Sequence, residues 1–248
     1  MPMRSRLCRT IRGLPPRSLR FFATSLPPCF LRMRTDANFV CTDGSPSRRL
    51  ACRERMMMRV IAGLYKGRPL AAPKGLNTRP TTDRVKESLM STLLSACGSF
   101  DGAYVLDAFA GSGALGIECI SRGAAAAHFF ERDRDALAAL RENIGKLGIS
   151  SDQARVFRAD IMKNPPVIGA VSYDIVFLDP PYAYSFEDVV GLVLKLKDHG
   201  RLAQGCVVSY EHAAEDDLAA FFDMRGIETD ILASKRFATT VIDLVQFN

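Results

Sequence analysis

The stretch Asp179-Pro180-Pro181-Tyr182 combines groups that could act together on an amine. It follows the apolar run 174–178, so the carboxylate of Asp179 stands at the end of a predicted strand. An amine attached to a nucleobase is a poor nucleophile, because its lone pair is delocalised into the ring. Asp179 and the Pro180 carbonyl could each accept one N–H and so turn that lone pair toward an electrophile. Tyr182 could stack on the base, while the prolines fix the carbonyl and add no competing donor.

A glycine-rich loop follows another predicted strand. In the run Asp107-Ala-Phe-Ala-Gly111-Ser-Gly113-Ala-Leu-Gly116 the glycines fit G-x-G-x-x-G, and Glu131 lies twenty residues after Gly111. Dinucleotide-binding loops share this pattern, so the motif alone leaves the cofactor open. Charge favours S-adenosylmethionine, because Asp107 would repel a pyrophosphate but attract the ammonium and sulfonium groups of that cofactor.

Acidic side chains end three successive predicted strands, at Asp107, Glu131 and Asp160. Glu131 could accept both ribose hydroxyls, and Asp160 could accept the adenine amino group. A single acid in such a place is most often a helix cap or a solvated strand end, but three acids beside a glycine loop favour a binding site. We therefore predict a cofactor site formed by Asp107, Phe109, Ala110, Gly111, Gly113, Glu131 and Asp160.

Short apolar runs alternate with longer amphipathic segments from residue 104 onward, which is typical of βαβ units around a mostly parallel sheet. The predicted strands cover 104–107, 127–131, 155–160, 174–179 and 206–210, and the predicted helices cover 115–121, 135–147, 186–196 and 214–222. Two last strands, 229–232 and 239–247, leave no room for a crossover helix and must be antiparallel. We predict an α/β, Rossmann-like fold with a mostly parallel seven-stranded sheet, a terminal antiparallel hairpin and helices on both faces.

The first 56 residues differ in composition from the rest. They contain 12 arginines and 3 acidic residues, a net charge of +9, whereas the remainder has a net charge of −3. We interpret them as a disordered extension, with an incorrectly assigned start before Met58, a targeting segment and a nucleic-acid-binding arm as open alternatives. Residues 57–100 are predicted as a small appended region with a helix over 84–94, and 101–248 as the cofactor-binding domain.

A local basic zone lies near the start of this remainder, with Asp83 as its only acid. A solvated surface and a phosphate-contacting patch both explain it. The basic zone consists of Arg59, Lys66, Arg68, Lys74, Arg79, Arg84 and Lys86.

The composition also excludes some classes of protein. No stretch approaches the roughly 18 apolar residues of a membrane-spanning helix. The seven cysteines form no CxxC pair and the three histidines have no ligand spacing, so we expect no metal, no disulfide framework and a cytoplasmic location.

Two pairs of motifs together resemble a known family. The segment DAFAGSGALGIECISRGA (107–124) with DPPY (179–182) resembles class I S-adenosylmethionine-dependent amino-methyltransferases. The segments RVIAGLYKGRPL (59–70) and RPTTDRVKESL (79–89) narrow the resemblance to the RsmD family. It spans about 59–248, becomes diffuse after 185, and implies methylation of guanine N2 in small-subunit ribosomal RNA with S-adenosylmethionine as cofactor.

The resemblance also implies roles for single residues. It places the cofactor loop on Asp107, Gly111 and Gly113, the ribose acid on Glu131, and the catalytic groups on Asp179, Pro180, Pro181 and Tyr182. In the family, the element at 79–84 borders the active-site mouth. The predicted substrate-binding residues are Arg59, Arg68, Arg79, Thr81, Arg84 and Tyr182.

The expected partner is small-subunit ribosomal RNA, either alone or within an assembling ribosomal particle, and the expected state is a monomer without membrane contact. Three alternatives stay open. An amino-methyltransferase acting on adenine or cytosine in DNA would use the same chemistry. A nicotinamide-dependent oxidoreductase would explain the glycine loop but not Asp107, and a non-catalytic RNA-binding factor would explain only the basic zone.

Overall fold

The computed structural model describes residues 58–73, 83–181, 183–237 and 240–247. The chain divides into the units Met1–Cys52 and Arg53–Asn248, and every described residue belongs to the second unit. The predicted extension 1–56 therefore lies outside the described residues, and the predicted boundaries at 56 and 100 stay predictions. No helix in the described ranges has both the length and the apolar character needed to cross a membrane.

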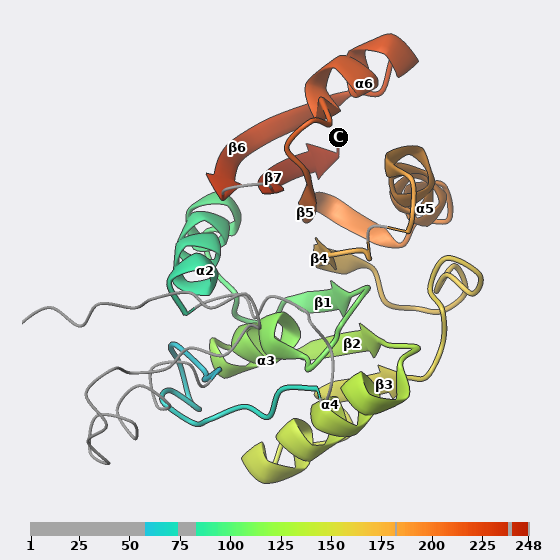
Figure 1. Ribbon diagram of the computed structural model, residues 1–248. Helices are drawn as coiled ribbons and strands as arrows, with labels where there is room; N and C mark the ends of the chain where they lie inside the picture. Colours follow the sequence, from blue (N-terminus) through green and yellow to red (C-terminus); the bar gives the residue numbers. More distant parts are fainter. Residues whose placement is uncertain (1–57, 74–82, 182, 238–239, 248) are drawn as a thin grey trace, which may run out of the picture. The chain divides into compact units, whose positions relative to one another are not determined.

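Seven strands form one sheet in the order β3-β2-β1-β4-β5-β7-β6 (Figure 1). Strands β1 to β5 pair in parallel, whereas β7 runs antiparallel to both of its neighbours, β5 and β6. The predicted fold class, with one reversed strand, is confirmed. The strands are β1 (Tyr104–Asp107), β2 (Ala126–Phe130), β3 (Ala154–Phe157), β4 (Tyr173–Leu178), β5 (Leu202–Ala213), β6 (Thr229–Phe237) and β7 (Thr240–Phe247).

The order of the sheet changes direction between β1 and β4. From β1 the chain adds β2 and β3 on one side and then returns to place β4 and β5 on the other. The loops that follow β1 and β4 therefore leave the sheet in opposite directions, which opens a crevice at their carboxyl ends. Both motifs singled out in the sequence follow one of these two strands.

Helices cover both faces of the sheet, because successive strand residues point to opposite sides. Val105 and Phe177 pack with α2, α3 and α4, whereas their neighbours Leu106 and Val176 pack with α5 and α6. Each face thus has its own hydrophobic core. The helices are α2 (Asp83–Cys97), α3 (Ala114–Ser121), α4 (Arg134–Leu147), α5 (Phe186–Asp198) and α6 (Leu218–Arg225).

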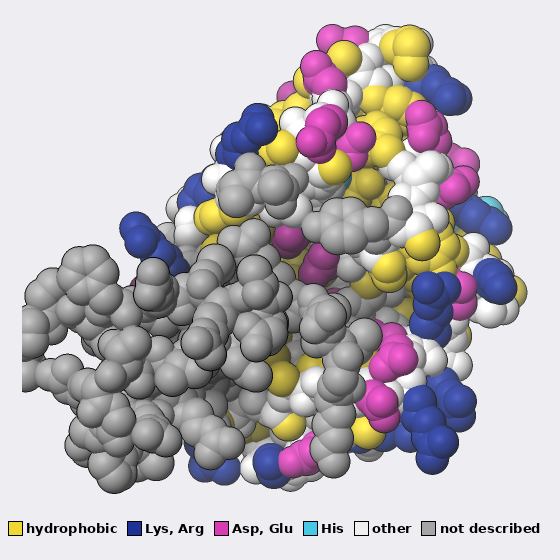
Figure 2. All heavy atoms as spheres, in the orientation of Figure 1, with side chains coloured by type: hydrophobic (Ala, Val, Ile, Leu, Met, Phe, Trp, Pro, Cys, Tyr) yellow, Lys and Arg dark blue, Asp and Glu magenta, His cyan; other side chains and the backbone are white. Residues whose placement is uncertain are grey.

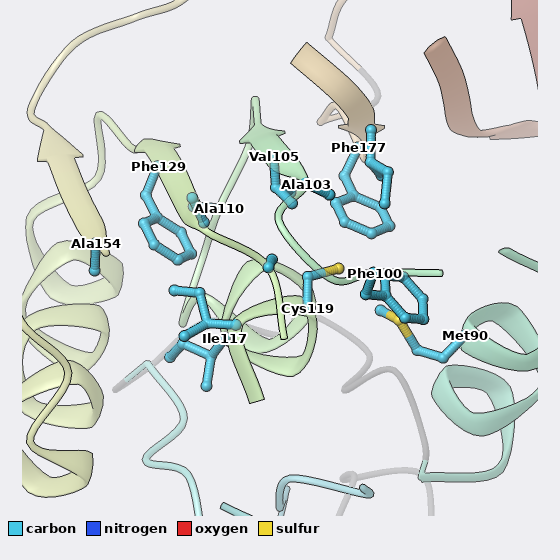
Figure 3. Close-up of a cluster of buried hydrophobic side chains, with 14 of the residues drawn as sticks. Met90, Phe100, Ala103, Val105, Ala110, Ile117, Cys119, Phe129, Ala154 and Phe177 are labelled. Carbon is cyan, nitrogen blue, oxygen red and sulfur yellow. The ribbon is translucent and has the colours of Figure 1, made fainter. Parts of the chain in front are cut away.

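The core on the α3 side fixes the helix that follows the glycine loop. Figure 3 shows Phe129 and Val105 of neighbouring strands directed toward Ile117 and Cys119 of α3. All four side chains are completely buried, and burial of each large apolar side chain contributes about 1.5–3 kcal/mol. The start of α3, and with it the glycine loop, is therefore firmly held against β1 and β2.

A buried ionic cluster attaches the segment 58–73 and α2 to α3. The side chain of Glu118 is fully buried and accepts hydrogen bonds from the main-chain N–H groups of Ile61 (2.8 Å) and Ala62 (2.9 Å). It also pairs with Arg122 at 2.8 Å and with the buried Lys86 at 3.4 Å. Lys86 donates its other hydrogen bond to the main-chain carbonyl of Arg59. The cluster satisfies a charge that would otherwise be costly to bury.

Several element boundaries differ from the predicted ones. The predicted turn at 233–237 is the second half of β6, which pairs with β7 as far as Phe237. The segment Ala-Ser-Lys-Arg has little strand preference of its own, so the partner strand decides its conformation. Helix α6 begins four residues later than predicted, because Asp217 caps it by accepting a hydrogen bond from Ala220 N at 3.0 Å.

Candidate active site

Four acidic residues meet at the carboxyl edge of the parallel strands. Asp107 is the last residue of β1, Glu131 follows β2 directly, Asp179 follows β4 directly, and Asp160 lies three residues beyond β3. Since β3, β2, β1 and β4 are consecutive in the sheet, the predicted cofactor acids and the predicted catalytic acid share one edge. The sequence placed Asp107, Glu131 and Asp179 correctly at strand ends, whereas the strand predicted to end at Asp160 ends at Phe157.

Asp107 is almost entirely buried beneath the glycine loop, with 3% of its surface exposed. Its Oδ2 accepts a hydrogen bond from Gly116 N, in the first turn of α3, at 3.1 Å. Loss of hydration, with a smaller contribution from the charge of Glu131, raises the pKa of Asp107 to about 7. The carboxylate therefore supports the start of α3, a role that the sequence did not predict, in addition to any attraction for a cationic ligand.

The glycines of the loop serve different purposes. Gly111 and Gly113 have φ angles of 55° and 79°, a left-handed conformation that favours glycine. A Cβ at Gly113 would lie 2.3 Å from Leu140 Cδ1, and one at Gly116 would lie 2.3 Å from Phe129 Cε1. Around Gly111, by contrast, a Cβ would meet nothing within 4 Å. Gly113 and Gly116 are needed for packing, while the backbone at Gly111 faces open space where a ligand can approach.

Glu131 holds the glycine loop from the neighbouring strand. Its Oε2 accepts a hydrogen bond from Gly111 N and its Oε1 accepts one from Asp133 N, each at 2.7 Å. Burial raises the pKa of Glu131, and these backbone donors oppose that change. A carboxylate oxygen has two lone-pair sites, so each oxygen can still accept a ribose hydroxyl. The residue fits the predicted ribose-binding role.

Asp160 already has side-chain partners that the sequence did not reveal. Tyr184 donates its hydroxyl to Asp160, 3.0 Å from Oδ2, and Arg132 Nη1 lies 3.1 Å from the same oxygen. The hydrogen bonds from Tyr184 and Arg132 outweigh the loss of hydration and lower the pKa of Asp160. In the sequence, these partners could have been suspected only from their positions: Arg132 directly follows Glu131, and Tyr184 lies two residues after Tyr182.

Asp179 is exposed at the end of β4, and no described residue donates a hydrogen bond to its carboxylate. Protein atoms crowded around the carboxyl group reduce its hydration even though its surface is open. This desolvation, followed by the negative charges of Glu211 and Asp107, raises the pKa of Asp179 to about 7. Pro180 and Pro181 follow it, whereas Tyr182 lies outside the described residues. Glu211, on β5, was not predicted as a neighbour.

Comparison with known proteins decides the family. The family model described as Conserved hypothetical protein 95 matches residues 58–238. The Ribosomal RNA small subunit methyltransferase D of Escherichia coli K12 is 38% identical over 162 residues, which cover 65% of this chain and 77% of that protein. The chain belongs to the RsmD family. A Bacillus subtilis member, Putative rRNA methyltransferase YlbH, is 37% identical over 65% of this chain and 85% of its own length.

Solved structures agree with this family and fold. The putative methyltransferase yhhF of Escherichia coli has a TM-score of 0.63 at 33% identity and covers 77% of this chain and 98% of its own. A magnesium protoporphyrin IX methyltransferase from Synechocystis, solved with bound S-adenosylmethionine, shares only the fold, with a TM-score of 0.50 at 18% identity over 66% of this chain and 79% of its own. Membership of the RsmD methyltransferase family, and not this distant neighbour, makes S-adenosylmethionine the cofactor, as predicted.

The predicted substrate residues of this RsmD family member are only partly described. Arg79, Thr81 and Tyr182 lie outside the described residues. Arg84 is exposed on α2, and Arg59, 58% exposed, pairs with Asp83 at 2.8 Å. The remaining member, Arg68, is also exposed and donates a hydrogen bond to the main-chain carbonyl of Lys146 at 3.3 Å.

Lys86 corrects the prediction of a basic zone over 59–86. Its side chain has no exposed surface and pairs with Glu118, so it contacts neither solvent nor a phosphate group. The sequence could not reveal this, because Glu118 lies in another helix. The described histidines have ordinary partners, such as Tyr173 for His128 and Asp243 for His212. Within the described ranges no group of three or more His, Cys, Asp or Glu side chains could hold a metal ion.

Proposed function

We propose that this protein methylates the exocyclic N2 amine of a guanine in small-subunit ribosomal RNA. Membership of the RsmD family supports the coarser statement, methylation of ribosomal RNA with S-adenosylmethionine. The finer statement is supported by one observation above all. An exposed carboxylate without a hydrogen-bond donor among the described residues, Asp179, stands at the crevice between β1 and β4.

The residues around the glycine loop fit the cofactor. When bound, S-adenosylmethionine supplies a methyl group on a positively charged sulfur. Gly111 leaves space beside its backbone, and Glu131 keeps free lone pairs for two hydroxyl groups. Asp107 lies under the same loop and adds negative potential when ionised.

Asp179 and Pro180 are the groups that prepare the amine. The two N–H groups of a guanine N2 amine can be accepted by the Asp179 carboxylate and by the Pro180 carbonyl, which accepts no hydrogen bond from any described residue. Accepting both hydrogens leaves the nitrogen lone pair directed away from these two oxygens. The nitrogen would take the methyl group as the carbon–sulfur bond breaks, so the positive charge passes from sulfur to nitrogen, and the proton would then be lost from nitrogen to Asp179 or to water.

The base must leave the RNA stack to reach this edge of the sheet. Pro181 continues the rigid turn, and stacking of the base on Tyr182 stays a prediction. On the face seen in Figure 2, Lys and Arg side chains are interspersed with acidic ones rather than forming one continuous basic surface. Phosphate contact therefore depends on particular cations, for which Arg59, Arg68 and Arg84 are the described candidates. Arg79 and Thr81 extend this set as predictions.

A radiolabelled methyl-transfer assay tests the function. Small subunits from a strain without the gene, naked small-subunit RNA and duplex DNA are incubated with the protein and tritiated S-adenosylmethionine. We expect label in the RNA, recovered as N2-methylguanosine after nuclease digestion and mass spectrometry. Label on another nucleoside or on DNA would contradict the proposal.

Comparison of the subunit with naked RNA shows whether the substrate is the assembled particle. Sedimentation of the active protein tests the expected monomer.

Asp179→Ala is the variant that tests the catalytic assignment. It should abolish turnover and leave the affinity for S-adenosylhomocysteine within a few fold. Retained turnover would remove Asp179 from the mechanism.

A further inference from the structure

Three polar side chains interlock where β2, β3 and β4 end. Arg132 follows β2, Asp160 follows β3, and Tyr184 lies in the loop after β4 that also carries Asp179. We propose that Tyr184 is a positioning residue that holds the catalytic loop 179–185 by tying it to Asp160 and Arg132. This inference rests on the proposed function, because it assigns a role in the same site.

The hydroxyl of Tyr184 uses its full hydrogen-bonding capacity. It donates to the Asp160 carboxylate, 3.1 Å from Oδ1 and 3.0 Å from Oδ2, and accepts a hydrogen bond from Arg132 Nη1 at 2.6 Å. The same Nη1 donates to Asp160 Oδ2 at 3.1 Å. The three groups thus close a ring of hydrogen bonds in which two members are charged. Hydrogen bonds to charged groups are stronger than those between neutral ones.

The phenol ring of Tyr184 makes the remaining connection, to the glycine loop. Its centroid lies 5.9 Å from that of Phe109, and the Cζ of Arg132 lies 5.3 Å above its face. One side chain therefore contacts residues from the loops after β1, β2 and β3.

The backbone of Tyr184 transmits this anchoring to the catalytic residues. Tyr184 N donates to the Pro181 carbonyl at 3.1 Å and so closes a turn. The next residue, Ser185, caps α5 by accepting a hydrogen bond from Asp188 N at 3.2 Å. Asp179 is held on one side by β4, and neither Asp179 nor Pro180 has such bonds within the described part of the chain, so on the other side their positions depend on the turn that Tyr184 anchors.

The anchor also connects the cofactor site with the catalytic loop. Asp160 is the predicted acceptor for the adenine amino group, and its two oxygens are those to which Tyr184 donates. A ligand that donates to Asp160 therefore shares this acid with the catalytic loop. Because Arg132 still pairs with Asp160 when the hydroxyl is lost, that loss should affect the reaction step more than the affinity for the cofactor product.

Tyr184→Phe tests the proposal, because it removes the hydroxyl and keeps the ring against Phe109 and Arg132. We expect kcat on small subunits to fall about tenfold, as for the loss of one charge-assisted hydrogen bond. The Kd for S-adenosylhomocysteine, measured by calorimetry, should stay within about threefold. In the protein free of RNA, backbone hydrogen exchange in a peptide covering 178–186 should be faster for Tyr184→Phe than for the wild type.

Controls separate positioning from other roles. Tyr104→Phe removes a hydroxyl from an exposed tyrosine at the opposite end of β1 and should change neither kcat nor exchange at 178–186. In an Asp160→Asn background, Tyr184→Phe should reduce kcat by clearly less than in the wild type, because the two groups act together. Arg132→Met provides a second variant that removes one partner of the hydroxyl.

Other outcomes would overturn the proposal. A raised Kd for S-adenosylhomocysteine with unchanged kcat would make Tyr184 a cofactor-binding residue only. Unchanged kcat with unchanged exchange at 178–186 would make it a packing residue only. If the wild type methylates no small-subunit RNA, the proposed function fails, whereas the exchange difference between wild type and Tyr184→Phe still decides whether Tyr184 holds the loop.

Discussion

The carboxylate of Asp179 changes charge within the pH range in which enzymes work, because its pKa is raised to about 7. The ionised form is the better acceptor for an amine N–H. We therefore predict that kcat/KM for the RNA rises about tenfold per pH unit below 7 and levels off above about 8. Initial rates between pH 5.5 and 9 measure this, at saturating S-adenosylmethionine so that ionisation of Asp107 does not contribute to the profile. Asp179→Asn should leave a weak activity without this rise, and an unaltered profile in that variant would exclude Asp179 as its source.

Ionisation of Asp107 has opposite effects on the stability of the protein and on the binding of the cofactor. Its pKa is raised in the folded state from 3.8 to about 7, so its contribution to stability is complete below about pH 4 and disappears as the pH rises through 7. Asp107→Asn keeps an acceptor for Gly116 N and removes the charge. We predict a higher Tm than wild type at pH 8, with at least tenfold weaker binding of S-adenosylmethionine, measured by thermal unfolding and calorimetry. A lower Tm at pH 8 would contradict this explanation.

Residue types and spacing predicted which acids stand at the strand ends, because a strand end and its following loop are local features. They did not predict the partners Arg132, Tyr184 and Glu211. Each of these lies after or on a different strand, so its contact depends on the sheet order and on the direction of the side chain. Lys86 was placed in the wrong environment for the same reason.

At the scale of elements, the pair Lys86–Glu118 joins α2 to α3, with both side chains fully buried. Removing Lys86 takes one of two cations from the buried Glu118 carboxylate and also removes the hydrogen bond to the Arg59 carbonyl. We predict that Lys86→Met lowers the free energy of unfolding by about 3 kcal/mol, measured by urea denaturation. The control is Lys146→Met, which breaks a mostly exposed pair with Glu142 and should change stability by less than about 1 kcal/mol. Equal effects of the two variants would argue against a special role for burial.

Helices with clear apolar periodicity were predicted well, as α4 demonstrates. Its observed range, Arg134–Leu147, differs from the predicted 135–147 by one residue, and Gly148 ends it in the left-handed conformation. The second half of strand β6, 233–237, was not predicted because its middle residues Ser234, Lys235 and Arg236 are polar and none of its residues is buried, so only pairing with β7 makes it a strand. Local sequence determines an element when its own burial pattern is strong, and the partner determines it otherwise.

At the scale of the whole molecule, RNA binding depends on where the cations lie, and on the face shown in Figure 2 the Lys and Arg side chains are interspersed with acidic ones. If Arg68 and Arg84 contact phosphates, each Arg→Gln variant should weaken RNA binding and reduce the slope of log Kd against log salt concentration by about one. Filter binding at several salt concentrations measures this slope. Arg225→Gln, on the last turn of α6, is the matched control and should leave the slope unchanged. Identical slopes for all variants would exclude these phosphate contacts.

The fold class could be predicted because alternation of strands and helices fixes a parallel sheet. The place of the reversed strand could not. A short connection requires β6 and β7 to be antiparallel, but it does not say which of them adjoins β5. The answer depends on which strand presents apolar residues on both faces, and β7 does so with Leu244 and Val245.

The position of β7 between β5 and β6 also sets an order of events during folding. Strand β6 has no hydrogen-bonding neighbour in the sheet other than β7, so it can join the sheet only after or together with β7. Until β7 pairs with β5, the edge of β5 is free to recruit a strand from another chain.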